Sequence, residues 1–249
     1  MKNSKTKSIL TAVGYLLVVF ALCFSVGIGF HAIYYESIYV SGISMSPTLT
    51  GADDTLGDQS GKVVDFGIVD HHKSAIKNIK RFDIVTTYYP LNDYNADGSL
   101  SKTCKKKIKR VIGMPGDTFK IEGGLLYTKE NDEYTLVPQP FLDGIEKTNA
   151  KDTAGDITLG EDEYWVLGDN RENSHDSGSA PNQKIKTENI YGVLVAIEGT
   201  GVLYVKDYKC PSCGDVTTSY GTGLCEKCNK ALEREYDIKS KHYHWPKYY

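Results

Sequence analysis

An uncharged, apolar segment near the amino terminus constrains this 249-residue chain more than any other feature. Residues 8–35 contain no Asp, Glu, Lys or Arg, and residues 9–30 are almost wholly apolar. Because about 20 apolar residues are enough for a helix to cross a bilayer, the segment predicts a transmembrane anchor. The alternative is a cleaved signal peptide, which needs a shorter apolar core that ends in small residues. Ala21-Leu22-Cys23 falls in the middle of the run, so we favour the uncleaved anchor.

The charges beside this segment predict its orientation. Lys2, Lys5 and Lys7 precede it, and no basic residue follows soon after it. Since Lys and Arg accumulate on the cytoplasmic side of membrane anchors, residues 1–7 are expected in the cytoplasm. The rest of the chain is then expected outside the plasma membrane. A net charge of −3 gives no argument for a nucleic-acid partner.

The chain beyond the anchor reads as mainly β. It is rich in Tyr, Val, Ile and Thr, which favour strands. Gly123-Gly124 and Asn131-Asp132 are typical of tight hairpin turns, and residues 91–102 and 138–160 read as loops. Strands are predicted at residues 63–69, 81–89, 108–113, 163–167, 190–197 and 202–205.

Ser44 and Lys109 are the candidate reactive pair. Ser44 lies between Gly42 and Pro47 in a stretch that, taken alone, also fits an ordinary surface turn. A serine hydroxyl is a weak nucleophile and needs a base. Lys109 is flanked by apolar residues in a predicted strand, and burial there would lower its pKa into a useful range. Strand alternation points Lys109 and Arg110 to opposite faces, so that one of them can be buried while the other is solvated.

A Ser-His-Asp arrangement is the alternative to a serine–lysine pair, although no histidine has flanking residues that suggest exact placement. The candidate histidines are His31, His71, His72 and His175. With Lys109 as the base the chemistry would be acyl transfer, and the backbone N–H of Ser44 could stabilise the oxyanion. The lysines that precede Ile108 (Lys105, Lys106 and Lys107) fit a solvated or membrane-facing patch.

The carboxy-terminal region contains two Cys-x-x-Cys pairs separated by eleven residues, Cys210/Cys213 and Cys225/Cys228. Four thiolates at this spacing suit a tetrahedral zinc ion, so we predict a zinc-ribbon-like tail with structural zinc. Two disulfides are the alternative, because the predicted topology places the tail outside the membrane.

Four segments in order, together with the anchor, resemble bacterial type I signal peptidase, a membrane-bound Ser-Lys protease. Residues 44–49 resemble its nucleophile segment, residues 81–85 the strand that follows, and residues 109–117 its lysine segment. Residues 168–177 resemble its last conserved loop. The resemblance covers residues 8–198 and implies a mainly β fold: an antiparallel β catalytic domain with a small β cap, between the transmembrane helix and the zinc-ribbon-like module.

The resemblance also implies roles for single residues. Ser44 would be the nucleophile and Lys109 the general base, with Ser174 orienting the lysine. Asp176 would hold the loop that Asp169 and Asn170 shape. Gly42 falls where some members have a second serine that helps the oxyanion hole.

The implied activity is removal of signal peptides from exported preproteins after small residues, at the bilayer and without a catalytic cofactor. The domains would be residues 1–7 (cytoplasmic), 8–35 (anchor), 36–205 (catalytic, with 118–160 as the cap) and 206–249 (tail). The tail could dock on the translocation machinery, grip substrate or stabilise the fold, and its sequence does not choose among these roles.

Two residues depart from the family pattern. Phe82 stands where glycine is usual, and Gly178 replaces an arginine that would pair with Asp176. The second departure and the added tail keep an alternative function open, an inactive relative that acts as a membrane-tethered zinc-ribbon binding module. A peptidase with narrow substrates is a further alternative.

Overall fold

The computed structural model divides the chain into two units, residues 1–36 and 37–249, which are described separately. It describes residues 2–52, 58–89, 106–145, 148–179, 183–218 and 224–248. The predicted loop at residues 91–102, Cys104 and Lys105 lie outside these ranges, as does the side chain of His31.

The first unit is a single long helix, α1 (Lys2–Tyr34). Its stretch Thr11–Gly29 has a mean hydropathy of 2.3 and is exposed along its whole length. Nineteen residues at a rise of 1.5 Å span about 28 Å, close to the hydrocarbon thickness of a bilayer. The helix is therefore long and apolar enough to cross a membrane, as predicted.

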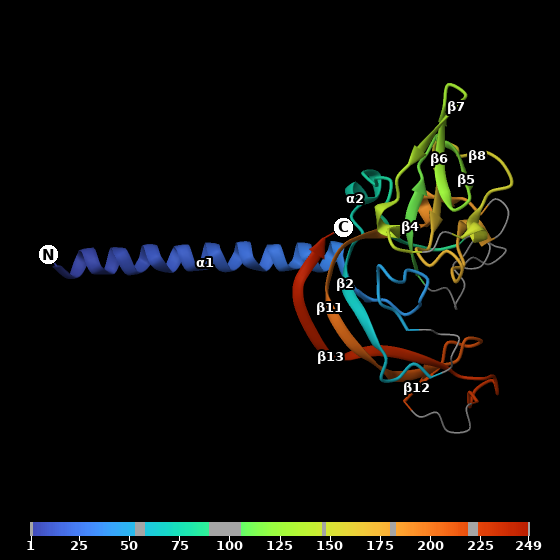
Figure 1. The fold of residues 1–249 in the computed structure, drawn as a ribbon. Helices are drawn as coiled ribbons and strands as arrows, with labels where there is room; N and C mark the ends of the chain where they lie inside the picture. Colours follow the sequence, from blue (N-terminus) through green and yellow to red (C-terminus); the bar gives the residue numbers. More distant parts are fainter. Residues whose placement is uncertain are drawn as a thin grey trace. The chain divides into compact units, whose positions relative to one another are not determined.

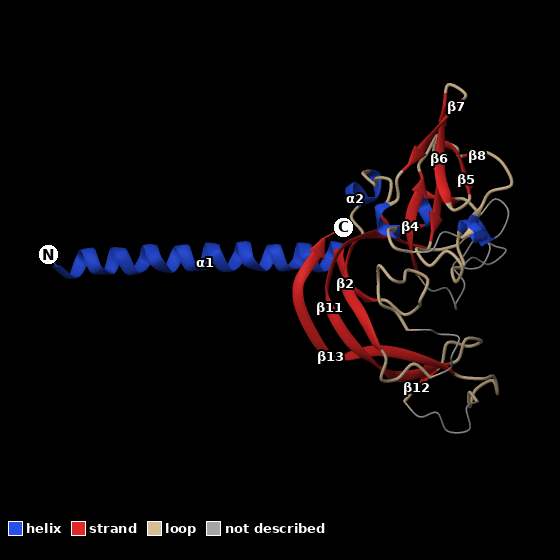
Figure 2. Cartoon of the chain, in the orientation of Figure 1, coloured by secondary structure: helices blue, strands red, loops and turns tan. Residues whose placement is uncertain are grey.

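The second unit is built mainly from strands (Figures 1 and 2). Its larger sheet has the order β1-β2-β11-β3-β4-β9-β10, with β12 and β13 paired to β11, and its smaller sheet has the order β7-β6-β5-β8. The strands of the larger sheet are β1 (Tyr35–Tyr39), β2 (Val63–Asp70), β3 (Ile84–Thr87), β4 (Lys107–Gly113), β9 (Glu163–Leu167), β10 (Ile185–Lys186), β11 (Ile190–Lys209), β12 (Val216–Thr217) and β13 (Glu233–Tyr248). Those of the smaller sheet are β5 (Thr118–Glu122), β6 (Leu125–Glu130), β7 (Glu133–Val137) and β8 (Ile157–Thr158). The helical turns are α2 (Lys73–Lys77), η2 (Pro140–Leu142), η3 (Asn149–Lys151), η4 (Ser177–Ser179) and η5 (Thr187–Asn189).

The smaller sheet confirms the predicted hairpins. Gly123 and Gly124 join β5 to β6, and Asn131 and Asp132 join β6 to β7. All four residues have positive φ, as hairpin turns that match the strand twist require.

The closing strands differ from the prediction. In place of two short strands, β11 runs without interruption from Ile190 to Lys209 and pairs with β2 and β13 (Figure 1). Shifts in register on both sides of Gly199 fall in the interval between the two predicted strands, residues 198–201. A Cβ at Gly199 would lie 2.1 Å from the carbonyl oxygen of His242, so only glycine lets β13 approach here.

The middle of the larger sheet is buried on both faces. Val111 belongs to one apolar cluster with Val85 and Val166, whereas Ile112 packs with Phe119 and Trp165 on the other face. This corrects the expectation for β4 that one basic residue can be solvated. Lys109 is 4% exposed and Arg110 is 5% exposed, so each needs its own partner.

Candidate functional site

The side chains of Ser44 and Lys109 meet, although 65 residues separate them in the chain. Lys109 Nζ donates to Ser44 Oγ at 2.7 Å and to the carbonyl oxygen of Ile108 at 2.8 Å. The geometry puts an amine directly against the serine hydroxyl, which favours the lysine over the histidine alternative.

Burial lowers the pKa of Lys109 from its ordinary 10.5 to about 8. Asp176 and Asp169 act in the opposite direction, whereas the cations Lys107 and Lys151 lower the pKa further. Desolvation is the largest of these effects, because the ammonium is removed from water and forms no ion pair with a carboxylate of the described residues. Near neutral pH a useful fraction of such a lysine is uncharged and able to accept a proton.

The turn that carries Ser44 is held by its apolar neighbours. Met45 and Leu49 are fully buried in a cluster with Val69 and Ile84. The backbone closes on itself through the hydrogen bond from Leu49 N to Met45 O at 3.0 Å. The residues that read as an ordinary turn in the sequence therefore form a rigid support for the hydroxyl.

The polar loop after β9 is hydrogen-bonded to this turn. Asn170 N donates to the carbonyl oxygen of Ser44 at 3.0 Å, and Asn170 Nδ2 donates to that of Ile43 at 3.3 Å. A Cβ at Gly168 would lie 2.2 Å from Ser174 Oγ and 2.3 Å from the Ser44 carbonyl oxygen. Gly168 had no role assigned from the sequence, and the structure shows that a glycine is needed there for the loop to approach the serine.

Asp169 forms a buried ion pair with Arg110. Arg110 Nε and one terminal nitrogen donate to the carboxylate at 2.9 and 2.7 Å, a two-point pairing, and both side chains are nearly inaccessible. The other terminal nitrogen donates to the Phe82 carbonyl oxygen at 2.8 Å. Phe82 has a φ of +77°, which explains why glycine suits this position, and its ring packs against Phe141.

Ser174 lies beside the pair without the predicted hydrogen bond. Its Oγ is buried and makes no hydrogen bond in the described structure, and the two acceptors of Lys109 are Ser44 and Ile108. A role for Ser174 in orienting the lysine stays a prediction.

Asp176 has a cation partner that the sequence did not reveal. Lys151 Nζ lies 3.0 Å from its carboxylate, and both side chains are buried. Asp176 also accepts from Gly168 N at 2.9 Å and from Gly178 N at 3.1 Å. The missing arginine at position 178 therefore does not leave the carboxylate without a counter-charge.

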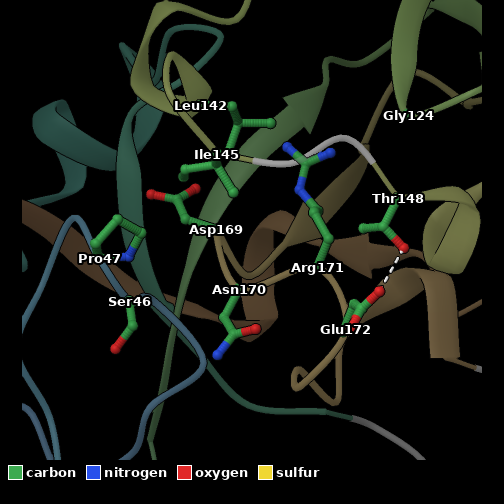
Figure 3. A pocket seen from close by; sticks show the side chains of 10 residues that line it. All are labelled: Ser46, Pro47, Gly124, Leu142, Ile145, Thr148, Asp169, Asn170, Arg171 and Glu172. Atoms are coloured by element: carbon green, nitrogen blue, oxygen red, sulfur yellow. Dashed lines mark hydrogen bonds between the residues drawn. The ribbon is translucent and has the colours of Figure 1, made fainter.

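Two cavities of about 510 Å³ each flank the turn that carries Ser44. The first is lined by Ser44 and Lys109, and also by Gly42. A Cβ at Gly42 would meet nothing within 4 Å, so the position has room for a larger residue. The second cavity lies between Ser46-Pro47 and the loop from Asp169 to Glu172, where Glu172 accepts from Thr148 at 2.8 Å (Figure 3).

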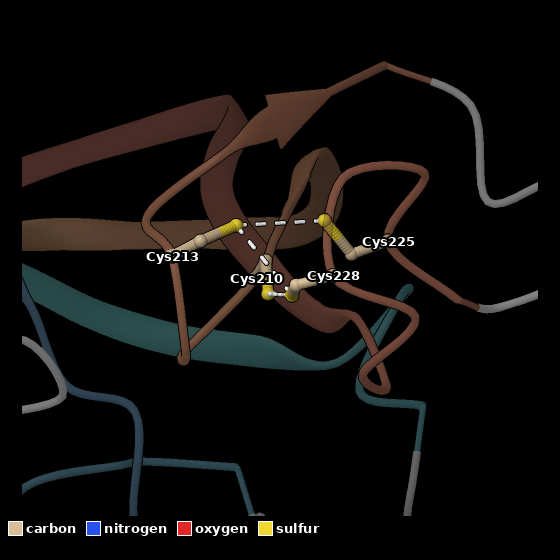
Figure 4. A group of neighbouring side chains, drawn as sticks. All are labelled: Cys210, Cys213, Cys225 and Cys228. Atoms are coloured by element: carbon tan, nitrogen blue, oxygen red, sulfur yellow. Dashed lines mark hydrogen bonds between the residues drawn. The ribbon is translucent and has the colours of Figure 1, made fainter.

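The four carboxy-terminal cysteines gather at one point, with their sulfurs directed at one another (Figure 4). The sulfur atoms all lie within 4.8 Å of one another, and the closest pairs are 3.3 and 3.5 Å apart. A disulfide bond is about 2 Å long, whereas sulfurs around a tetrahedral zinc are separated by about 3.8 Å, given Zn–S of about 2.3 Å. The four thiols could hold one metal ion.

The two cysteine pairs have matching backbone geometry. Gly214 N donates to Cys210 O and Asn229 N to Cys225 O, both at 2.8 Å. Gly214 and Asn229 have positive φ, so each pair ends in the same left-handed residue.

Comparison with known proteins agrees with this geometry. The family model described as signal peptidase, peptidase S26, matches residues 10–197, which leaves the cysteine cluster outside the match. Signal peptidase I V of Bacillus subtilis is 32% identical over 165 residues, covering 62% of this chain and 80% of the relative. Signal peptidase I U of the same organism is 27% identical over 181 residues, covering 71% and 79%.

A solved structure, a signal peptidase I from Enterococcus faecalis, is 25% identical with a TM-score of 0.35, covering 47% of this chain and 97% of the other. The family match spans most of the chain and includes Ser44, Lys109 and the loop after β9. The resemblance seen in the sequence is thereby confirmed, and the chain belongs to the signal peptidase family, peptidase S26.

Proposed function

We propose that this signal peptidase I-type serine peptidase works through a Ser44–Lys109 dyad and removes signal peptides after small residues. The observation that carries the proposal is the 2.7 Å contact between Lys109 Nζ and Ser44 Oγ, made by a lysine that is 4% exposed. Family membership supplies the general activity, and the dyad supplies a mechanism.

In the acylation step, uncharged Lys109 accepts the proton of Ser44 while Oγ attacks the carbonyl carbon of the scissile peptide bond. The backbone N–H of Ser44 is the proposed donor to the resulting oxyanion. Lys109 then gives its proton to the leaving nitrogen, the C–N bond breaks, and the signal peptide remains as an ester on Ser44. The mature protein leaves with a new amino terminus.

In the deacylation step, Lys109 accepts a proton from water, whose oxygen attacks the ester. The proton returns to Ser44 Oγ as the ester bond breaks, which releases the signal peptide with a free carboxylate. Atoms and protons balance over the two steps.

A preprotein substrate tests this specificity. The full chain in detergent should produce a single new amino terminus, read by sequencing, directly after a small residue. A matched substrate with Trp in place of that small residue should be cleaved about 10²-fold more slowly, because a bulky side chain displaces the carbonyl from Ser44. Equal cleavage of both substrates would contradict the proposed preference.

The smaller sheet lies within residues 118–160, which supports the proposed cap. We propose residues 36–205 as the catalytic domain and residues 206–249 as the tail, with β11 (Ile190–Lys209) running across that boundary and joining the two. We propose that α1 anchors the chain with Lys2, Lys5 and Lys7 in the cytoplasm, because basic residues precede its apolar stretch. The dyad would then act outside the plasma membrane on exported preproteins, and docking of the tail on the translocation machinery remains one of its proposed roles.

The alternative of an inactive, tethered binding module rested partly on the lost arginine at position 178. Because Lys151 pairs with Asp176, the absence of an arginine at 178 no longer argues for an inactive protein, and the ion pair supports the enzyme function.

We propose in addition that Cys210, Cys213, Cys225 and Cys228 hold a structural zinc ion. Purified full-length chain should contain one zinc per molecule by metal analysis, and Cys213→Ser should contain much less, because a tetrahedral site then loses a thiolate ligand. Cys23→Ser is the matched control and should keep its zinc. A chain with no zinc and no free thiols at these four positions would instead establish the disulfide alternative.

A further inference from the structure

The loop that borders the dyad closes around one buried ammonium group. Lys151 belongs to η3, before β8 of the smaller sheet, and is 7% exposed. Its Nζ contacts the Ser174 carbonyl oxygen at 2.8 Å, Ser179 Oγ at 2.9 Å and the Asp176 carboxylate at 3.0 Å. An ammonium has three N–H donors, so these three acceptors match its whole capacity.

This cation is connected to the reactive serine by a short series of contacts. Asp176, which Lys151 neutralises, accepts from Gly168 N at 2.9 Å. Gly168 in turn lies against both Ser174 and the carbonyl of Ser44, without space for a side chain. A shift of the 174–179 loop would therefore reach the residues packed on the nucleophile turn.

Gly178 provides the space that Lys151 occupies. A Cβ at position 178 would lie 2.9 Å from Lys151 Cδ, closer than carbon atoms can approach. The next neighbours of this Cβ would be Leu167 Cδ2 at 3.2 Å, a tight contact, and Asp176 Oδ1 at 3.5 Å, an ordinary one. The φ of Gly178 is not in the left-handed region, so the backbone itself does not require glycine. The steric demand for glycine comes mainly from the lysine stem.

We propose that Lys151 is a positioning residue for cleavage. Lys151 takes the place of the cation that the family pattern carries at position 178, and Gly178 leaves the space that Lys151 needs. Lys151, in the cap region, thereby supplies the counter-charge of Asp176 from outside the 174–179 loop. The inference rests on the proposed Ser44–Lys109 mechanism, because its effect is to hold the loop against this pair. The family pattern has an arginine at position 178. A side chain at 178 and the stem of Lys151 would occupy the same space, so the cation can be carried at position 151 or at position 178 but not at both.

The charge of Lys151 also acts on Lys109. The groups that influence the Lys109 pKa besides burial are Asp176 and Asp169, which raise it, and Lys107 and Lys151, which lower it. Removing Lys151 takes away one cation and leaves Asp176 without its ion pair. Both changes raise the pKa of Lys109, so the pH–rate curve should move to higher pH.

The test moves the cation from position 151 to position 178 in the full-length chain and measures kcat/KM against pH on one preprotein. Lys151→Ala should lower the plateau rate by about 10²-fold, the order that a 1 Å misplacement costs, and should move the midpoint to higher pH. Lys151→Ala combined with Gly178→Arg should recover most of the rate and return the midpoint. Gly178→Ala should impair the wild type but add nothing in the Lys151→Ala background, because the clashing Cδ is gone.

Two comparisons keep the outcomes distinct. Lys129→Ala, which removes another cap lysine paired with the partly exposed Asp156, should change neither rate nor midpoint. The proposal is overturned if Lys151→Ala combined with Gly178→Arg cleaves no faster than Lys151→Ala alone. It is also overturned if Lys151→Ala lowers stability while the midpoint of the pH–rate curve stays in place. Full cleavage by Lys109→Met would instead contradict the underlying dyad, which is a separate result.

Discussion

Replacing Lys109 by methionine should reduce kcat/KM for preprotein cleavage by about 10²–10⁴-fold, the range that a general base contributes. Methionine fills much of the same buried space but cannot accept the Ser44 proton, so the loss would come from chemistry more than from packing. Cleavage is measured in detergent with the full chain. Ser44→Ala should be at least as damaging, and the two changes together should cost little more than one, because the residues act as a unit.

A lysine outside the site provides the control for this prediction. Lys73→Met, at an exposed position of helix α2, should retain wild-type cleavage. Substantial cleavage by Lys109→Met, with Lys73→Met unchanged, would mean that another group activates Ser44.

Replacing Arg110 by methionine should lower the free energy of unfolding by about 3–5 kcal/mol, the usual cost of breaking a buried ion pair. Asp169 would remain buried in the loop after β9 without its ion-pair partner, since its side chain is fully inaccessible. Cleavage should fall as well, because the same loop holds the Ser44 carbonyl through Asn170. Chemical denaturation of the detergent-solubilised chain gives the stability.

A double substitution separates lost pairing from lost packing. Arg110→Met with Asp169→Leu removes both charges, and should recover much of the stability, because an apolar pair of similar volume often matches a buried ion pair. Lys184→Met, which breaks the more exposed pair with Glu163, should have little effect. A double variant as unstable as Arg110→Met alone would argue against the ion pair as the cause.

The sequence was most informative where local chemistry decides the structure. The turn residues at Gly123-Gly124 and Asn131-Asp132 specify hairpins through their own backbone preferences, independently of tertiary contacts. The strand at residues 163–167 was predicted at its observed bounds. The candidate pair also came from local signals, a serine in a rigid turn and a lysine among apolar residues. Family membership confirms the resemblance that these signals suggested.

The sequence was least informative where tertiary packing decides. Alternation on β4 correctly separates Lys109 from Arg110 but cannot show that both faces are covered, so the burial of both was missed. Lys151 lies in a polar segment that reads as a loop, and only the fold brings it to Asp176, 25 residues later. Gly168 belongs to the segment 168–177 that resembles a family loop, yet the close approach that it permits depends on Ser44 being opposite.

The carboxy-terminal region shows the same division. The Cys-x-x-Cys spacing predicted one cluster of four sulfurs, and the structure brings them within 4.8 Å. The spacing did not predict that β13 would return along β11, with Glu233 opposite Lys209 and Tyr248 opposite Ala196. The cluster therefore lies at the end of a long hairpin that is continuous with the larger sheet (Figure 1).

The pH dependence of kcat/KM tests the central claim, that burial makes Lys109 the base for Ser44, most directly. This quantity reports the ionisation of the free enzyme, and the pKa of Lys109 is lowered to about 8. Because the uncharged amine is the active form, the rate should rise with pH, pass its midpoint near 8 and then level off, with this rise absent in Lys109→Met. A rise centred near the ordinary lysine pKa of 10.5, or a rise near 8 that persists in Lys109→Met, would contradict the account.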